Sequence, residues 1–351
     1  MEHNRRRILF IDDDTEEVDV FRILLGPECE ALHIDAPDQI ERAMSEFLPD
    51  CVMIDHNLGT TTSLEVLAKL KAREYTGPVA FIILTGSNSL DLAVQCMRSG
   101  AHDFLVKGKL NRNEFNRAIE RAMRNAELEF RIHRVAYYDT LTGALNRKSL
   151  WEKLEERLVR AEKTDNKFAV LNIDLDRFKY INDTFGHYFG DCVLSNVVSR
   201  TKTCLSSGDF IARTGGDEFL VLVNAGQSHS ELLQLADRIR TGLTEPMKID
   251  GKSVSVTPSV GIATYPDDGT TIDELINHSD VAMYAAKTDG KNRVRAFDED
   301  LKSETDHRNM LEQALRQACD NEEFVVHYQP IVNELGEVVG LEALLRWQRP
   351  G

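Results

Sequence analysis

One short stretch decides how the rest of the chain is interpreted, namely Arg213-Thr214-Gly215-Gly216-Asp217-Glu218-Phe219. Apolar runs flank it at residues 210–212 and 219–223. Two short apolar runs around a Gly-Gly pair predict a β-hairpin, and glycine lets a ligand approach the main chain closely. Asp217 and Glu218 are adjacent carboxylates at this turn, and they repel each other unless a cation lies between them. The stretch is therefore either a solvated acidic turn or part of a cation site.

A second acidic group lies upstream and favours the cation site. Residues 168–173 form an apolar run that predicts a strand, and this run ends in Asp174-Leu175-Asp176. Carboxylates from a strand end and from a hairpin tip can converge on one hard cation, which takes oxygen ligands. The sequence therefore predicts a cation site between Asp174 and the hairpin turn.

These motifs together resemble the GGDEF family, the diguanylate cyclases. Five segments carry the resemblance, at residues 139–147, 174–183, 186–191, 215–219 and 285–293. The resemblance implies an α+β domain of the palm-like cyclase type, which we assign to residues 139–299. It also implies a reaction that joins two GTP molecules into cyclic di-GMP with loss of two pyrophosphates.

The same resemblance implies the residues of the cyclase site. Asp174 and Asp217 would hold Mg²⁺ or Mn²⁺, with the carbonyl oxygen of Leu175 as a further ligand. Glu218 would either complete this metal site or assist deprotonation of the attacking 3′-hydroxyl, and the sequence leaves both roles open. Because one domain binds one GTP and the product contains two, the catalytic unit would be a homodimer.

Contacts to guanine and to phosphate are implied in the same way. Asn182 and Asp191 would select guanine, because a carboxylate can accept from its N1–H and its exocyclic amine together, and adenine lacks that pair. The alternative is structural, an Asx turn at Asn182 and a helix N-cap at Asp191. Lys179, Lys287 and Lys291 would contact the phosphates, although each alone is an ordinary exposed helix charge.

The first part of the chain alternates between predicted strands and helices. Four apolar runs predict buried strands of a parallel sheet, at 8–11, 51–54, 79–84 and 103–106. In such sheets, ligands lie beyond the carboxyl ends of the strands. Polar side chains follow the four strands at that end, and they are Asp12, Asp13, Asp55, Thr85 and Lys107.

This constellation resembles the receiver domain of bacterial response regulators, a flavodoxin-like (βα)5 fold, which we assign to residues 1–121. The implied roles are the phosphoacceptor Asp55, the Mg²⁺ ligands Asp12, Asp13 and Asp55, the phosphoryl-binding Thr85 and Lys107, and the aromatic switch residue Phe104. An upstream histidine kinase would be the phosphodonor. Two residues depart from the family pattern, because Gly59 and Gly108 stand where proline is usual, and both are expected to loosen loops beside the site. A degenerate receiver that docks without being phosphorylated is the alternative.

Residues 122–138 link the two domains within a charged region that predicts a long helix. Its side chains recur at alternating spacings of four and three, in the order Ile119, Met123, Ala126, Phe130, His133 and Tyr137. This heptad-like stripe predicts a two-stranded coiled coil. A surface helix packed on its own domain is the alternative.

Residues 300–351 resemble the start of an EAL domain, a cyclic di-GMP phosphodiesterase built as a barrel. One helical face carries Leu311, Ala314, Leu315 and Ala318, and strands are predicted at 324–332 and 340–347. Such a barrel needs about 250 residues. We therefore expect a truncated chain with an incomplete barrel start, in which Glu342 matches a metal ligand but no hydrolysis occurs.

The composition argues against several other classes of function. The formal charge of −16 disfavours binding to nucleic acid or to anionic membrane surfaces. Six cysteines occur without a Cys-x-x-Cys pair, which favours reduced thiols over a disulfide or zinc framework. No signal peptide and no apolar run of membrane-spanning length is recognisable, so we expect a cytoplasmic protein.

Two functions are compatible with these motifs. The first is a phosphorylation-regulated diguanylate cyclase of a two-component pathway. The second is a GTP-binding GGDEF module without turnover that regulates the EAL phosphodiesterase of a longer parent protein. For either, the family's inhibitory product site, Arg-x-x-Asp, reads Ser206-Ser207-Gly208-Asp209 here, and the missing arginine predicts no tight product binding at that surface.

Overall fold

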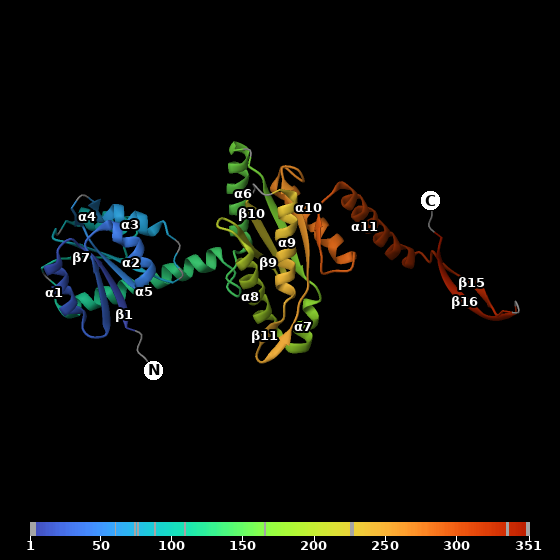
Figure 1. Cartoon of the computed structure of the whole chain (residues 1–351), viewed down its shortest axis with the longest axis horizontal. Coiled ribbons are helices and arrows are strands. Elements are labelled where there is room, and N and C mark those ends of the chain that lie inside the picture. Colours follow the sequence, from blue (N-terminus) through green and yellow to red (C-terminus); the bar gives the residue numbers. More distant parts are fainter. Residues whose placement is uncertain are drawn as a thin grey trace. The chain divides into compact units, whose positions relative to one another are not determined.

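The structure is a computed structural model that describes residues 5–348 except 60, 74, 76, 88, 109, 165, 225–227 and 335–336. The chain divides into two compact units, Met1–Ala136 and Tyr137–Gly351. Each unit has its own sheet, coloured blue in the first and green to orange in the second (Figure 1). Among the described residues, no helix has the length and apolar character needed to cross a membrane.

The first unit is built on a five-stranded parallel sheet in the order β2-β1-β3-β6-β7. Its strands are β1 (Arg6–Ile11), β2 (Cys29–Ile34), β3 (Cys51–Asp55), β6 (Ala80–Thr85) and β7 (Asp103–Val106). Its helices are α1 (Thr15–Leu25), α2 (Ile40–Phe47), α3 (Ser63–Lys71), α4 (Leu90–Arg98) and α5 (Arg112–Tyr137), and the short elements are η1 (Pro37–Gln39), β4 (Asn57–Leu58) and β5 (Thr61–Thr62). This strand order confirms the flavodoxin-like prediction.

Alternating side chains of the central strands fill two hydrophobic cores, one on each face of the sheet. Ile8 and Phe10 of β1 pack with helices α1 and α5, whereas Leu9 and Ile11 pack with α2, α3 and α4. Successive residues of a strand point to opposite faces, so a run that is apolar throughout can fill both cores. Strand β2 was not among the four predicted runs, because its sequence Cys-Glu-Ala-Leu-His-Ile is neither continuously apolar nor fully buried.

Helix α5 corrects the first half of the predicted coiled-coil stripe. Ile119 and Ala126 are buried in the core beside α1, and Met123 packs against that core. These side chains are therefore unavailable to a partner helix. The apolar side chains that α5 does expose lie further along, at Leu128 (52%), Ile132 (70%) and Val135 (66%). Their spacing of four and three is also heptad-like, in a different register.

The second unit contains a five-stranded sheet in the order β14-β13-β8-β10-β9, antiparallel except for β13 and β14. Its strands are β8 (Phe168–Leu175), β9 (Phe210–Gly215), β10 (Glu218–Asn224), β13 (Pro258–Tyr265) and β14 (Val294–Ala296). Its helices are α6 (Arg147–Thr164), α7 (Phe178–Phe185), α8 (His187–Cys204), α9 (His229–Thr244) and α10 (Ile272–Thr288), and a small hairpin joins β11 (Met247–Ile249) to β12 (Lys252–Val254). The hairpin predicted around residues 215–216 is confirmed as β9–β10.

Helices cover both faces of this sheet. Helices α7, α8 and α9 share one core with the odd-numbered residues of β8, and α6 and α10 share the other with Phe168 and Val170. Helix α10 lies close to β13 at Gly261, because a Cβ there would stand 2.1 Å from the backbone oxygen of Ser279 and 2.2 Å from the backbone nitrogen of Met283. The missing side chain therefore sets how closely α10 approaches the sheet.

The last elements are helix α11 (Glu299–Asp320) and the antiparallel pair β15 (Phe324–Val332) and β16 (Val338–Trp347). The helix and both strands were predicted from the sequence and are confirmed. The pair exposes several large apolar side chains, which are Val326, Tyr328, Ile331, Val338, Val339, Leu341 and Leu345. Glu342 lies on β16 and is exposed.

Candidate functional site

The signature turn of the second unit lies directly beside the end of β8. In the ladder between β10 and β8, Glu218 is the partner of Asp174. Directly paired residues of an antiparallel ladder point to the same face, so these two carboxylates are neighbours. The register with β9 shifts between Glu218 and Phe219, and this bulge moves the turn residues relative to the strand. The two acidic motifs found in the sequence therefore meet, as predicted.

A lysine side chain forms an ion pair with the first of these carboxylates, that of Asp174. Nζ of Lys287, from α10, is 2.7 Å from Oδ2 of Asp174, whose residue is only 6% exposed. Burial raises the pKa of Asp174 to about 6, Lys287 opposes that rise, and the charges of Asp217 and Glu218 add to it. Lys287 thus neutralises only part of the negative charge that gathers here. The remaining charge and the oxygen-only donor set, with the Leu175 carbonyl at the end of β8, fit a hard divalent cation.

The turn itself is fixed by an arginine whose role the sequence did not reveal. Nε and Nη2 of Arg213 donate to the carbonyl oxygen of Gly216 at 3.0 and 2.7 Å. Nη1 of the same guanidinium lies 3.3 Å from the carboxylate of Asp139. Asp139 also accepts from the backbone and hydroxyl of Thr142. The Asp139–Thr142 segment is therefore tied to the signature turn across more than seventy residues of sequence.

The two residues assigned to guanine lie on adjacent helices. Asn182 is inside α7, and Asp191 is in the second turn of α8, so neither is a helix cap or part of an Asx turn. A Cβ at Gly190 would stand 1.9 Å from Oδ1 of Asn182. The amide of Asn182 therefore packs directly on the backbone beside Asp191. The two structural alternatives are therefore excluded, and the assignment of Asn182 and Asp191 to guanine stays a prediction.

The three lysines assigned to phosphate differ in their surroundings. Lys287 forms the ion pair with Asp174, whereas Lys179 is exposed near the start of α7. Lys291 lies in the turn after α10, where it has a left-handed φ of 66°. The turn is held by the backbone N–H of Lys291, which donates to the carbonyl oxygen of Ala286 at 3.0 Å.

The first unit contains a more tightly gathered acidic site. Asp12, Asp13 and Asp55 each offer a carboxylate oxygen, and these atoms all lie within 4.8 Å of one another. Within the described part of the chain, no other group of three acidic, cysteine or histidine side chains converges so closely. Asp12 and Asp55 come from the carboxyl ends of adjacent parallel strands, which explains the convergence. Oxygen donors in this number fit Mg²⁺.

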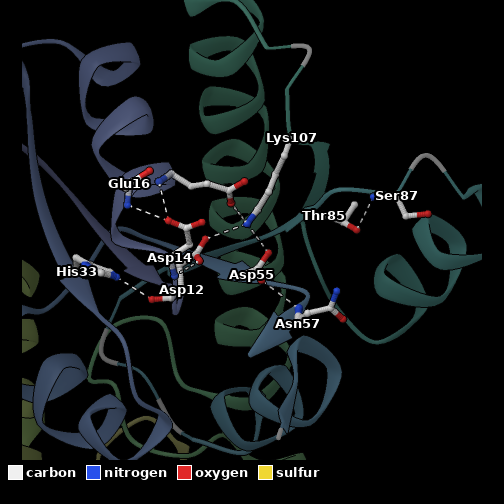
Figure 2. A network of polar contacts seen from close by, with 10 residues as sticks. Asp12, Asp14, Glu16, His33, Asp55, Asn57, Thr85, Ser87 and Lys107 are labelled. Atoms are coloured by element: carbon white, nitrogen blue, oxygen red, sulfur yellow. Dashed lines mark hydrogen bonds and ion pairs between the residues drawn. The ribbon is translucent and has the colours of Figure 1, made fainter. Parts of the chain in front are cut away.

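The positively charged side chain of Lys107 lies among these carboxylates (Figure 2). Its Nζ is 2.7 Å from Oδ1 of Asp55 and 3.1 Å from Oδ2 of Asp12, and it also contacts Glu17. Burial lowers the pKa of Lys107, but hydrogen bonds to Asp55 and Glu17 and the charge of Asp12 outweigh burial and raise it. The side chain of Lys107 therefore stays protonated and positively charged. Glu17 was not among the predicted site residues, because nothing in the sequence distinguishes it from other acidic residues of α1.

Other predicted receiver residues surround the same cluster. Thr85 is buried at the end of β6 and its hydroxyl accepts from the backbone of Ser87 at 3.1 Å, as Figure 2 shows. Phe104 on β7 is partly buried and packs on the core formed by α2, α3 and α4. Gly59 and Gly108 have φ of 60° and 79°, which proline cannot adopt. Glycine therefore suits the backbone at both positions, and the expectation that these residues loosen the loops stays a prediction.

Comparison with known families gives three matches along the chain. The family described as "Diguanylate cyclase, GGDEF domain" matches residues 136–293. "Response regulator receiver domain" matches 8–120, and "EAL domain" matches 312–351.

Curated relatives match the chain over part of their length. Bifunctional diguanylate cyclase/cyclic di-GMP phosphodiesterase MucR of Pseudomonas aeruginosa is 39% identical over 217 residues, which are 62% of this chain and 32% of MucR. Cyclic di-GMP phosphodiesterase PdeR of Escherichia coli is 39% identical over 227 residues, which are 65% of this chain and 34% of PdeR. The chain thus spans about a third of the length of these curated relatives.

A solved structure of the isolated GGDEF domain of TpbB (YfiN) from Pseudomonas aeruginosa is 37% identical, covering 48% of this chain and 99% of that one, with a TM-score of 0.47. The three family matches show the receiver–GGDEF–EAL architecture: the chain carries a receiver domain, a GGDEF domain and the start of an EAL domain.

Proposed function

We propose that the GGDEF domain condenses two GTP molecules into cyclic di-GMP and that phosphorylation of the receiver at Asp55 controls this activity. One observation carries the proposal. Asp174 and Glu218 face each other across the β8–β10 ladder, and Lys287 lies 2.7 Å from Asp174 at the same place. Carboxylates that bind a cation, next to a lysine that binds phosphate, are what nucleotidyl transfer requires.

In the proposed reaction, the 3′-hydroxyl oxygen of one GTP forms a bond to the α-phosphorus of the other. The bond between that α-phosphorus and the oxygen bridging it to the β-phosphorus breaks, and pyrophosphate leaves. The reverse attack, by the 3′-hydroxyl of the second GTP on the α-phosphorus of the first, closes the ring and releases the second pyrophosphate. The chemistry that a bound Mg²⁺ or Mn²⁺ supplies is neutralisation of charge on the attacking and leaving oxygens. Asp174, Asp217 and the Leu175 carbonyl are the residues that would hold it, and Glu218 either joins them or receives the hydroxyl proton.

The remaining residues of the domain position the nucleotide. The Asp191 carboxylate accepts from the N1–H and the exocyclic amine of guanine, Asn182 contacts the same base, and adenine would leave the carboxylate without those two donors. Lys287, Lys291 and Lys179 neutralise the β- and γ-phosphates. Lys287 would exchange its contact with Asp174 for the phosphates of a bound GTP, so one lysine would serve both the empty and the occupied site.

The control by phosphorylation is proposed to act through dimerisation. One GGDEF domain holds one GTP, so two copies must face each other. A dimer of receivers raises the effective concentration of one GGDEF domain for the other. The exposed side chains Leu128, Ile132 and Val135 of α5 give the two copies an apolar seam outside the receiver core. An upstream histidine kinase would supply the phosphoryl group.

A second candidate function rests on a particular relative. PdeR is named a cyclic di-GMP phosphodiesterase and is as similar to this chain as MucR, which is named bifunctional. The GGDEF domain would then bind GTP without turnover and regulate an EAL domain. The same residues would bind nucleotide in both cases, so the two candidates differ only in turnover.

One experiment separates the two candidates. The chain is incubated with GTP and Mg²⁺, with and without acetyl phosphate as a small phosphodonor, and the products are separated by anion-exchange chromatography. Formation of cyclic di-GMP, stimulated by acetyl phosphate in the wild type but not in Asp55→Asn, supports the cyclase. Binding of GTP in calorimetry without any product supports the regulatory module. Absence of both binding and product contradicts both candidates.

A further inference from the structure

Asp176 is a buried carboxylate that has no part in the function proposed above. It follows Asp174 by two residues and is 8% exposed. Its Oδ1 accepts from the hydroxyl of Ser259 at 2.8 Å, and its Oδ2 accepts from the hydroxyl of Thr257 at 2.7 Å. Its own backbone N–H donates to the carbonyl oxygen of Thr257 at 2.8 Å. Both carboxylate oxygens are thus engaged by donors of the protein.

One further donor connects Asp176 to a distant turn. The backbone N–H of Asn292 donates to Oδ2 of Asp176 at 3.0 Å, across 116 residues of sequence. Asn292 directly follows Lys291, one of the three lysines that would bind phosphate. A hydrogen bond to an ionised, buried acceptor is stronger than one between neutral groups. Asp176 therefore links the strand that ends in Asp174 to the turn that carries Lys291.

The turn has a backbone that needs such support. Gly290, Lys291 and Asn292 have φ of 117°, 66° and 46°, three successive residues in the left-handed region. A lysine there is strained, and such strain persists only where the surroundings hold the backbone in place. The side-chain oxygen of Asn292 accepts from Nη1 of Arg240 at 2.9 Å, which secures the outer side of the turn. Asp176 secures the inner side, next to the acidic site.

We propose that Asp176 is a positioning residue for the triphosphate: it fixes the Lys291–Asn292 turn relative to Asp174, so that Lys291 meets the phosphates while Asp174 binds the cation. This inference rests on the proposed function, because it assumes that Lys291 binds phosphate. It assigns the second aspartate of Asp174-Leu175-Asp176 a role different from that of the first. One carboxylate oxygen of Asp174 is left for a ligand to bind, whereas both carboxylate oxygens of Asp176 accept hydrogen bonds from the protein itself.

The test compares two nucleotides that differ in the phosphates Lys291 would bind. The full chain is titrated calorimetrically with the α,β-methylene analogue of GTP, which cannot release pyrophosphate, and with GMP, both in the presence of Mg²⁺. Asp176→Asn replaces one accepting oxygen by a donor that faces other donors. We expect the affinity for the analogue to fall about ten-fold, the loss typical of one hydrogen bond to a charged group. The affinity for GMP should change less than two-fold.

A double-mutant cycle then shows whether Asp176 acts through Lys291. In a Lys291→Ala background, Asp176→Asn should cause no further loss of affinity for the analogue. The matched control is Asp289→Asn, which removes a carboxylate from the same turn that pairs outward with Arg295 at 2.7 Å. This control should leave both affinities unchanged. Thr257→Val, which removes one donor to Asp176 without changing its charge, should weaken analogue binding in the same direction by a smaller factor and serves if Asp176→Asn fails to fold.

Three outcomes overturn the inference. Equal losses for the analogue and for GMP would mean that Asp176 only supports the fold. Full additivity with Lys291→Ala would mean that it does not act through that lysine. Unchanged analogue binding in both Asp176→Asn and Thr257→Val would mean that the turn holds without it. A wild-type chain that binds neither nucleotide would instead overturn the proposed function itself.

Discussion

The receiver and the GGDEF domain each place a lysine 2.7 Å from an aspartate at the end of a strand, Lys107 on Asp55 and Lys287 on Asp174. The surroundings of the two pairs differ. Lys107 is 13% exposed and contacts three carboxylates, and the receiver acids already converge within 4.8 Å. Lys287 is 31% exposed and contacts one carboxylate, while Glu218 across the ladder is exposed.

The difference follows from the direction of the strands. Neighbouring parallel strands bring their carboxyl ends to one edge, so Asp55 at the end of β3 meets Asp12 and Asp13, which directly follow β1. In the GGDEF domain, β8 is antiparallel to β10, so Asp174 lies near a strand end while Asp217 and Glu218 lie at a hairpin turn. The receiver site is thus assembled before any ligand binds. In the GGDEF domain, Asp174 and Glu218 are paired across the ladder, and under the proposed function a bound cation and nucleotide would draw the site together.

The largest effect on turnover is expected from substitutions in the acidic site of the GGDEF domain. Asp174→Ala or Asp217→Ala should lower turnover by about three orders of magnitude, because losing several kcal/mol of charge neutralisation acts on that scale. Turnover is measured from cyclic di-GMP formed at saturating GTP and Mg²⁺. Asp267→Ala, which removes an exposed carboxylate paired with Lys167, is the control and should leave turnover unchanged. Turnover within ten-fold of wild type in either site variant would contradict the assignment.

A substitution in the receiver should have a smaller effect on turnover, and this effect should depend on phosphorylation. Asp55→Asn removes the acceptor but leaves the cyclase site intact, so basal turnover should persist. With acetyl phosphate present, we expect dimerisation and turnover to be lower than in wild type by about ten-fold or more, since effective concentration is lost. Light scattering and product formation measure the two quantities. Asp38→Asn is the control, and identical behaviour of Asp55→Asn and wild type would show that the receiver is not the switch.

The raised pKa of Asp174 predicts that cation binding at the GGDEF site depends on pH. The folded-state pKa is about 6 against an ordinary 3.8, so the folded protein keeps this proton to a higher pH than the unfolded chain. The contribution of Asp174 to stability therefore falls as pH rises from about 4 to about 6. Mg²⁺ requires the ionised carboxylate, so its stabilising effect should grow over this interval and level off near pH 7, about one unit above the pKa.

The measurement is the rise in melting temperature on adding Mg²⁺, from pH 5 to 7.5. It uses an Asp13→Asn background, in which the receiver cluster has lost a ligand. Lys287→Ala should move the transition to higher pH, because Lys287 holds the pKa of Asp174 down. A rise in melting temperature that is equal at pH 5 and pH 7 would contradict the prediction.

The smallest expected effect concerns the surface around Asp209, outside both sites. Its Oδ1 accepts from the backbone of Asn224 at 2.8 Å and its Oδ2 from the backbone of Ser206 at 2.9 Å, so the carboxylate serves the turn. Without an arginine at 206, a charge-assisted contact of roughly 1.5–3 kcal/mol is missing. Calorimetry should show no tight binding of cyclic di-GMP there, and Ser206→Arg would create it only if the turn accommodates the longer side chain. Tight binding by wild type that Asp209→Ala abolishes would show the prediction wrong.

The sequence allowed a large part of the fold to be predicted, because strand ends and turns carry their chemistry locally. Asp12, Asp55 and Lys107 each follow an apolar run, and parallel strands then bring them together without further information. The signature hairpin was readable for the same reason. Strand β2 was not, since an edge strand with half-exposed residues has no continuous apolar run.

The features that could not be predicted from the sequence are contacts between segments that are distant in the sequence. The periodic residues Ile119 and Ala126 indicate a buried helix face, but periodicity does not say whether the receiver or a second copy buries it. The ion pair of Lys287 with Asp174 joins residues that are distant in sequence. The hydrogen bonds of Asp176 likewise become visible only when the turn after α10 is folded against β8 and β13.

The contact at Gly261 has a mechanical consequence for the position of Lys287. Helix α10 is a rigid rod that touches β13 through its backbone at Ser279 and Met283, with no side chain as a spacer. Lys287 lies one turn beyond Met283 on the same rod. A methyl group at 261 would act as a wedge against the main chain of the helix, which cannot yield locally, so the whole rod would shift. The distance between Lys287 and Asp174 thus depends on the absence of a single carbon atom on the neighbouring strand.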